Sequence, residues 1–351
     1  SSDGDFLNVL FSADRKSKYD SAREYIQRKV KYCMIKIIVD FCQNHRGDPI
    51  ILQEMIHQAK ENGATYGKIQ TIFSDDLTFR QEFEERRVVN GKVVSIKRPY
   101  KQEYKRLKKL ELSYEQQAYF VSECNKWGLK PLTTCFTRGS VHNIANLGMD
   151  TIKVASYDCG SLPLIKDLAE RFKCLIISTG ATFDNEIKMT ASYLNHIKKD
   201  YAFLHCVTIY PTPLKSIHLN RINFLKKFVS KVGLSEHTLA AKDGVKASLA
   251  AIYYGVDYVE RHFTILKPEE TKDGPVSITP AQLKEVVGFS RLNKDDQKVY
   301  INENVPEYLI ILGSEKRSLT DEEKLNRSYY RGRFSTRKGG TVIYNWEDVT
   351  I

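Results

Sequence analysis

The 351-residue chain lacks the features that mark membrane-spanning, disulfide-bonded and dinucleotide-binding proteins. No apolar run approaches the roughly 20 residues that span a bilayer, and no signal peptide opens the chain. The seven cysteines are scattered and form no C-x-x-C pair, a usage typical of reduced proteins. No Gly-x-Gly-x-x-Gly follows the first predicted strand. We therefore expect a cytoplasmic protein with no membrane association and no such nucleotide-binding loop.

Charge is plentiful, and the excess is positive: 54 Lys and Arg stand against 43 Asp and Glu, a net charge of +11. The densest basic stretch is 97–109, a pattern typical of a solvated helix or loop face. A loop that closes over an anionic ligand is the other interpretation. Nucleic-acid binding is disfavoured because no recognised binding motif accompanies the charge, so we expect no nucleic-acid partner.

From Tyr32 onward, apolar runs of strand length alternate with segments of helical periodicity. The predicted strands are 33–39, 66–72, 130–136, 151–156, 174–179, 202–208, 232–235 and 258–263. The predicted helices are 49–62, 113–127, 138–147, 162–172, 184–198, 217–229, 239–255 and 280–292. Eight strands, each followed by a helix, predict an α/β protein with a closed (β/α)8 TIM barrel. A doubly wound open sheet is the alternative.

The pattern also divides the chain. Residues 1–31 are polar with little periodicity and are predicted to form an N-terminal arm, while 32–299 form the barrel domain. The segment 73–112 interrupts the alternation, being long, charged and aromatic. A long segment without regular structure inside a domain is usually a functional lid or a disordered insertion.

Polar side chains occupy the carboxyl ends of the predicted strands, which form the active face of a barrel. Lys68 and Lys153 lie there with several hydroxyl groups and a Ser-Thr-Gly turn at 178–180. Lysine charges, hydroxyls and backbone N–H groups at helix starts suit an anionic phosphate. A Schiff base on Lys68 or Lys153 is the competing chemistry.

Two histidines end the last two predicted strands: His237 in Gly-Leu-Ser-Glu-His-Thr (233–238) and His262 in Val-Glu-Arg-His-Phe-Thr (259–264). A strand-helix-strand unit returns the chain in the same direction, so both ends emerge on one face. The two imidazoles could therefore bind one divalent metal ion that activates a carbonyl. A packing role for either histidine is the alternative.

Together these motifs resemble the N-acetylneuraminate (sialic acid) synthase family, phosphoenolpyruvate-dependent enzymes that make nonulosonic acids. The matching pieces run in family order from about Lys36 to Thr264. Besides the two histidine segments they are Asn-His-Arg-Gly-Asp (44–48), Lys-Ile-Gln-Thr (68–71), Thr-Cys-Phe (134–136), Ile-Lys-Val-Ala-Ser (152–156), Leu-Ile-Ile-Ser-Thr-Gly (175–180), Leu-His-Cys (204–206) and Tyr-Pro-Thr-Pro (210–213).

The resemblance implies a role for each matching position. His237 and His262 would hold Mn²⁺ or Mg²⁺, which polarises the aldehyde of an open-chain N-acyl mannosamine-type sugar. The implied phosphoenolpyruvate site consists of Lys68, Thr134, Lys153, Ser156, Ser178 and Ser235. The implied sugar-contact positions are Gln70, Thr208 and Tyr210. Of these groups Lys68 and Lys153, together with Asp40 and Glu260, form the expected catalytic set.

The chain departs from the family pattern at several places. Asp40 stands where the family usually has glutamate, and Thr208 where it has asparagine. The usual Gly-Pro-Asp reads Gly-Pro-Val at 274–276, which leaves Asp273 as the nearby carboxylate. Residues 300–351 resemble a linker and a partial C-terminal antifreeze-like (SAF) domain. The arginine that this domain contributes to the partner subunit's site would lie beyond Ile351, and the resemblance implies a homodimer.

The sequence thus predicts a metal-dependent nonulosonic acid synthase. It would condense phosphoenolpyruvate with an N-acyl amino sugar, free or 6-phosphorylated, and release phosphate. A related synthase that condenses phosphoenolpyruvate into another deoxy-sugar acid is one alternative. A barrel that binds sugar or phosphate without turnover is the other, because Asp40, Thr208 and Val276 differ from the family pattern.

Overall fold

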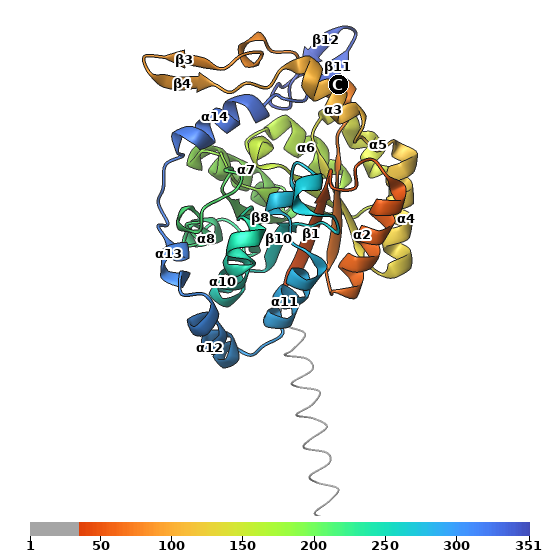
Figure 1. Ribbon diagram of the computed structural model, residues 1–351. Coiled ribbons are helices and arrows are strands. Elements are labelled where there is room, and N and C mark those ends of the chain that lie inside the picture. Colours follow the sequence, from red (N-terminus) through yellow and green to blue (C-terminus); the bar gives the residue numbers. More distant parts are fainter. Residues whose placement is uncertain (1–34) are drawn as a thin grey trace, which may run out of the picture. The chain divides into compact units, whose positions relative to one another are not determined.

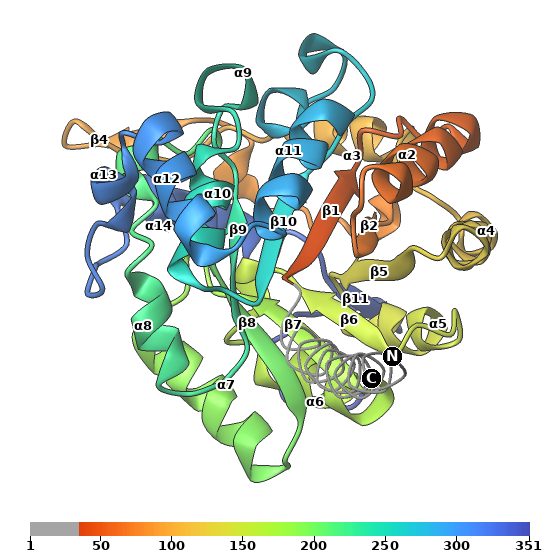
Figure 2. The ribbon, with the colours of Figure 1, turned by 90° about the horizontal axis from the view of Figure 1, so that it is seen from below.

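Eight parallel strands form a closed ring in the computed structural model, which describes residues 35–351. In ring order the strands are β1, β10, β9, β8, β7, β6, β5 and β2. Their bounds are β1 Lys36–Cys42, β2 Tyr66–Thr71, β5 Lys130–Cys135, β6 Thr151–Val154, β7 Cys174–Ser178, β8 Asp200–Cys206, β9 Val232–Glu236 and β10 Tyr258–His262. Figure 2 shows this ring of strands with the helices outside it. The predicted TIM barrel is confirmed.

Helices surround the ring, and most begin where the sequence offers a capping side chain. Their bounds are α2 Pro49–Glu61, α4 Tyr114–Trp127, α5 Val141–Ala145, α6 Leu162–Arg171, α7 Asp184–His196, α8 Arg221–Lys226, α9 Ala240–Asp243, α10 Lys246–Tyr254 and α11 Pro280–Ser290. Ser113 caps α4 in a reciprocal capping box with Gln116, and Gly128 ends that helix in the left-handed conformation. The Asp48 carboxylate accepts from the first backbone N–H groups of α2.

The interior of the barrel is filled by apolar side chains toward the amino ends of the strands. The buried cluster consists of Ile38, Tyr66, Leu132, Ile176, Ala202, Leu204 and Tyr258. Side chains along a strand alternate between its two faces, so the residue two positions further on also points inward. At most of these positions that residue is polar, as in Ile38 followed by Asp40 and Tyr66 followed by Lys68. An apolar layer therefore supports a polar layer at the carboxyl ends.

The first strand lies later than predicted, at Lys36–Cys42 in place of 33–39. The prediction stopped before Asp40, because an ionised carboxylate is rarely buried in a strand unless it is paired. Here Asp40 is paired, and it lies beside His262 of β10 in the sheet register. Residues 33 and 34 and the predicted N-terminal arm, 1–31, lie outside the described residues.

The segment 73–112 has regular structure, so of the two interpretations the disordered insertion is wrong. It contains a hairpin of β3 (Arg87–Val89) and β4 (Lys92–Ser95), followed by helix α3 (Tyr100–Lys108). Asn90 and Gly91 both have positive φ at the turn, as two-residue hairpin turns require. Figure 1 shows the hairpin extending sideways, away from the barrel, while α3 lies over the carboxyl end of the ring.

The C-terminal residues return to the same end of the barrel. After α12 (Lys294–Asn304) and α13 (Tyr308–Leu312), helix α14 (Asp321–Tyr330) leads to the hairpin of β11 (Thr336–Lys338) and β12 (Thr341–Ile343). Figure 1 shows α14, β11 and β12 together with α3 at the carboxyl end of the barrel strands. Residues 36–351 form one compact unit. That 300–351 represent a linker and part of an antifreeze-like domain stays a prediction.

Among residues 35–351, no helix combines the length and apolar character that crossing a lipid bilayer requires.

Candidate active site

The polar layer at the carboxyl ends of the strands surrounds a pocket of about 380 Å³. Every residue predicted to form the site lines this pocket, except Thr208. The lining set is Asp40, Lys68, Gln70, Thr134, Lys153, Ser156, Ser178, Tyr210, Ser235, His237, Glu260 and His262. The sheet register places several of them side by side on neighbouring strands, as with Gln70 and Thr134, or Ser235 and Glu260.

Lys68 lies at the centre of a buried charge cluster. Its Nζ is 2.7 Å from Asp40 Oδ2 and 3.5 Å from Glu260 Oε2, and it donates to Thr134 Oγ1 at 3.2 Å. Burial alone would raise the pKa of Asp40, but Lys68 and His262 lower it to about 2. Burial would likewise lower the pKa of Lys68, yet Asp40 and Glu260 hold it above its usual value. These two groups are therefore charged at neutral pH, which makes each tolerable inside the barrel.

Lys153 occupies a second position on the pocket wall, closer to hydroxyl groups. Its Nζ donates to Ser178 Oγ at 2.6 Å and lies 3.8 Å from Glu260 Oε1. Burial lowers the pKa of Lys153, an effect that the attraction of Glu260 partly offsets. Nearby, the Gly180 N–H donates to Ser156 Oγ at 3.2 Å. Two ammonium groups, hydroxyls and a backbone N–H thus lie along one wall of the pocket, as a phosphate site requires.

The two predicted metal-binding histidines lie together at the pocket mouth. The rings of His237 and His262 are 4.8 Å apart, centroid to centroid, and nearly perpendicular. Tyr210 packs against both rings, at 4.1 Å from His237 and 6.3 Å from His262. Burial, followed by the positive groups around it, lowers the pKa of His237 well below its usual value. His237 is therefore a neutral imidazole, the form that binds metal ions.

The residues around His262 fit a divalent ion. Asp40 Oδ2 lies 3.7 Å from His262 Nε2, which is too far for a hydrogen bond but suits two ligands of one ion. A neutral imidazole, a second imidazole and an ionised carboxylate are ligands that divalent metals accept in proteins. That His237 and His262 bind the ion stays a prediction.

Thr208 is the predicted site residue that the structure places elsewhere. It is fully buried, and its backbone carbonyl accepts from Asn326 Nδ2 of α14 at 2.7 Å. Its methyl group lies where a side chain on Gly180 would have to fit. The strand pattern placed Thr208 at the end of the predicted strand 202–208, but β8 ends at Cys206 and Thr208 does not line the pocket.

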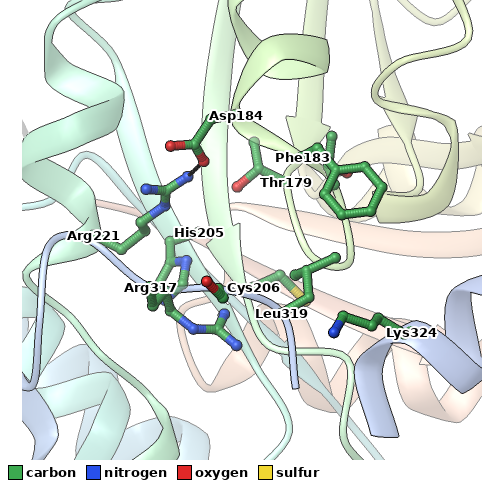
Figure 3. A pocket seen from close by; sticks show the side chains of 11 residues that line it. Thr179, Phe183, Asp184, His205, Cys206, Arg221, Arg317, Leu319 and Lys324 are labelled. Carbon is green, nitrogen blue, oxygen red and sulfur yellow. Dashed lines mark hydrogen bonds and ion pairs between the residues drawn. The ribbon is translucent and has the colours of Figure 1, made fainter. Parts of the chain in front are cut away.

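A second cavity, of about 390 Å³, lies beside the first and shares Cys206 with it. Figure 3 shows that Arg221 faces Asp184 there, with Arg317 below Arg221 and beside His205. His205, polar and at the end of β8, faces this cavity, and burial lowers its pKa to about 3. Arg221 of α8 donates to the Glu315 carbonyl and so binds the segment before α14 to the barrel, while Arg317 of that segment pairs with Glu323 of α14.

Several side chains that line the first pocket were not predicted individually. Arg98 and Arg106 come from the basic stretch at 97–109, and the remaining ones from the C-terminal region are Glu322, Asn326, Tyr330, Arg333 and Phe334. The density of charge in 97–109 was the signal that could have identified these two arginines. Nothing in the sequence indicated that α14 covers the pocket, because its docking depends on contacts far apart along the chain.

Comparison with known proteins supports the predicted relationship. N,N'-diacetyllegionaminic acid synthase of Legionella pneumophila is 28% identical over 86% of this chain and 80% of its own length. A protein of Methanocaldococcus jannaschii, whose name assigns no activity, is 32% identical over 73% of this chain and 70% of its own length.

The fold comparison agrees with the sequence comparison. The crystal structure of N-acetylneuraminic acid (sialic acid) synthetase from Leptospira borgpetersenii matches with a TM-score of 0.63 and 22% identity, over 84% of this chain and 90% of that one. At this identity the match shows the shared barrel fold. Residues 55–296 match the NeuB family, and this range contains most of the barrel and the whole set of predicted site residues except Asp40. The chain therefore belongs to the NeuB family of sialic acid and related nonulosonic acid synthases.

Proposed function

We propose that this protein is a metal-dependent synthase that condenses phosphoenolpyruvate with an N-acyl hexosamine of the mannosamine type, free or 6-phosphorylated. The product would be a nonulosonic acid, and phosphate would be released. One observation carries the proposal: two buried lysines and two buried imidazoles face the same pocket at the carboxyl end of the barrel. The chain's membership of the NeuB family supports the proposal.

The lysine side of the pocket suits phosphoenolpyruvate. Lys153 and Lys68 are about two strands apart and supply positive charge, while Ser178 and Thr134 already accept from them. Replacing those internal hydrogen bonds by phosphate or carboxylate oxygens would keep both ammonium groups satisfied. Arg106 and Arg333 add positive charge at the rim. Phosphoenolpyruvate, with three negative charges at most, would be attracted into this region.

The histidine side suits the sugar. His237 and His262 would hold Mn²⁺ or Mg²⁺, which would supply Lewis-acid polarisation of the sugar aldehyde. Tyr210, about half exposed, and Gln70, which donates to Asp40 at 3.0 Å, border this region and would contact the sugar. The carboxylates of Glu260 and Asp40 would accept hydrogen bonds from sugar hydroxyls.

The proposed reaction forms a C–C bond and a C–O bond and breaks the C–O bond to phosphate. Carbon 3 of phosphoenolpyruvate bonds to the aldehyde carbon, whose oxygen takes up a proton and becomes a hydroxyl group. Carbon 2 becomes cationic, and water adds to it and loses a proton. Phosphate then leaves by cleavage of its C–O bond, while the new hydroxyl group loses its proton and becomes the ketone carbonyl. Glu260 lies between Lys68 and Lys153 and accepts from Ser235 at 2.8 Å, so a fixed negative charge is available to stabilise that cationic carbon.

The proposal also includes the compartment and the oligomeric state. The cysteine usage supports a cytoplasmic protein. The resemblance to the family supports a homodimer. Analytical ultracentrifugation of the purified chain would test the dimer directly, with a monomeric mass as the contradicting result.

A panel of N-acyl hexosamines, each free and 6-phosphorylated, tests the function. Each sugar would be incubated with phosphoenolpyruvate and a divalent ion, and released phosphate would be measured together with the nine-carbon product by mass spectrometry. We expect release with one sugar class only, and none without sugar or after chelation of the metal. Sugar and phosphoenolpyruvate binding without phosphate release from any sugar would instead support a barrel that binds without turnover.

A further inference from the structure

A thiol completes a group of metal-binding side chains beside the proposed ion site. Asp40, Cys42 and His262 each offer one ligand atom, and these atoms all lie within 4.8 Å of one another. All three side chains are buried, with Cys42 fully inaccessible. Asp40 and Cys42 come from the end of β1, and His262 lies beside Asp40 on β10. Among the described residues, this is the group of three ligands that the geometry brings together.

The backbone at the end of β1 turns Cys42 toward this group. Cys42 has a φ of 49°, a left-handed conformation that residues other than glycine rarely adopt. The pairing register between β1 and β2 shifts between Asp40 and Cys42, as at a β-bulge. Bulges re-aim side chains next to active sites. Here the Cys42 N–H donates to Asp40 Oδ1 at 2.8 Å, which fixes the carboxylate next to the thiol.

The neighbouring imidazole supplies an independent indication of a ligand. His262 Nδ1 is buried without a hydrogen-bond partner among the described residues. A buried polar atom without a partner is destabilising, so such an atom in a native structure calls for an explanation. The thiol itself makes only a weak contact, with Asp40 O at 3.3 Å from Sγ. A metal ion would be bound by one nitrogen of the imidazole together with the sulfur.

We propose that Cys42, together with Asp40, is a further ligand of the divalent ion that His237 and His262 would hold, and that the site therefore prefers softer ions such as Co²⁺ and Zn²⁺ to Mg²⁺. The inference rests on the proposed function, because that function supplies the ion, and it refines which ion the site takes. On binding, the thiol releases its proton to solvent and the thiolate binds the metal. Thiolate and imidazole ligands favour zinc and its neighbours, whereas magnesium prefers oxygen ligands.

Cobalt spectroscopy tests the thiolate without relying on activity. A thiolate bound to Co²⁺ gives a near-ultraviolet charge-transfer absorption that nitrogen and oxygen ligands do not give. We expect this absorption when the wild-type protein is titrated with Co²⁺, and its loss in Cys42→Ser. The control is Cys174→Ser, which removes a partly exposed thiol at the amino end of β7 and should keep the absorption.

Metal competition gives a second measurement. Loss of a residue that hydrogen-bonds to a metal ligand typically weakens metal binding about 10- to 100-fold. Loss of Cys42, a direct ligand, should weaken Co²⁺ and Zn²⁺ binding at least that much, and Mg²⁺ binding less. Cys42→Gly repeats the test in a variant whose backbone suits the φ of 49°, so it guards against misfolding of the serine variant. Wild-type protein that binds Co²⁺ without the absorption, or Cys42→Ser that keeps it, would overturn the inference.

Failure of this inference is distinguishable from failure of the proposed function. Metal-dependent phosphate release by a protein whose bound Co²⁺ shows no thiolate absorption would overturn the role of Cys42 alone. If the absorption depends on Cys42 but none of the sugars leads to phosphate release, the metal site would be supported and the proposed synthase activity would be overturned.

Discussion

At the scale of single residues, a carboxylate and an ammonium group are tolerated inside the barrel because they pair with one another. Asp40 and Lys68 are each less than 4% exposed and lie 2.7 Å apart, with Glu260 as the second carboxylate beside the ammonium. Two buried charges of opposite sign compensate each other's desolvation, whereas one alone does not. The cluster is therefore a structural element as well as a binding site.

Lys68→Met tests this reading of the charge cluster. The substitution leaves the buried Asp40 without its ammonium partner and Glu260 with Lys153 alone, and we expect it to lower the free energy of unfolding by about 3–5 kcal/mol. Urea denaturation of the variant measures the change. The double variant Lys68→Met/Asp40→Asn removes the unpaired carboxylate and should recover part of the lost free energy of unfolding. Lys101→Met, at an exposed position on α3, is the matched control and should change little. A double variant no more stable than Lys68→Met would contradict the coupling.

At the scale of elements, α3 and the C-terminal region hold one another over the pocket. Glu103 of α3 bonds with Arg106 of the same helix and with Arg333, which follows α14. Burial would raise the pKa of Glu103, but the hydrogen bonds and charges of Arg106 and Arg333 lower it to about 2. Because the folded-state pKa lies below the usual value, this contribution to stability is present above about pH 4.5 and is lost as the pH falls toward 2.

Glu103→Gln tests the docking of the C-terminal region. The amide keeps the shape of the side chain but loses the charge, so we expect the free energy of unfolding at pH 7 to fall by about 1.5–3 kcal/mol. Limited proteolysis should cut more readily between α13 and α14. The free energy of unfolding should fall less on acidification from about pH 4.5 toward pH 2 than it does in the wild type. Glu303→Gln, at an exposed position of α12, is the control. Unchanged proteolysis and stability in Glu103→Gln would show that the region docks through other contacts.

The elements also show what the sequence could and could not predict. Strands and helices of the barrel were predictable because burial on both faces makes a strand continuously apolar, and helices carry the 3.6-residue period. The polar ends of those strands identified Lys68, Lys153 and both histidines. The arrangement of α14 over the pocket, the left-handed conformation of Cys42 and the burial of Thr208 depend on φ values and long-range contacts. None of these leaves a periodic signal in the sequence.

At the scale of the whole molecule, the chain's end is tied to the barrel by a buried carboxyl group. Asp158, which follows β6, accepts from Asn345 Nδ2 and from Ser161 Oγ, both at 3.0 Å. Burial raises the pKa of Asp158 to about 6, although these hydrogen bonds and Arg331 oppose the shift. The folded state therefore holds a proton that the unfolded state has lost between about pH 4 and pH 6, so stability falls as the pH rises through that window.

Asp158→Asn tests this pH dependence. A shift from 3.8 to about 6 corresponds to at most about 3 kcal/mol. The amide cannot ionise, so between pH 4 and pH 7 the unfolding free energy of the variant should fall less than that of the wild type, by up to this amount. Burial also raises the pKa of Asp76 to about 6, so some of the dependence should remain. Asp150→Asn, at an exposed position, should follow the wild type. Identical pH profiles for Asp158→Asn and wild type would contradict the buried, proton-holding carboxyl.

The most direct test of the central claim concerns the two imidazoles whose rings lie 4.8 Å apart at the mouth of the barrel. Phosphate release from phosphoenolpyruvate would be measured with the accepted sugar and a saturating divalent ion in wild type, His237→Ala and His262→Ala, with circular dichroism as the check on folding. The account predicts that both variants fold, and that each loses phosphate release and metal binding together. Full activity in either folded variant would show that the imidazoles do not hold the ion on which the proposed reaction depends.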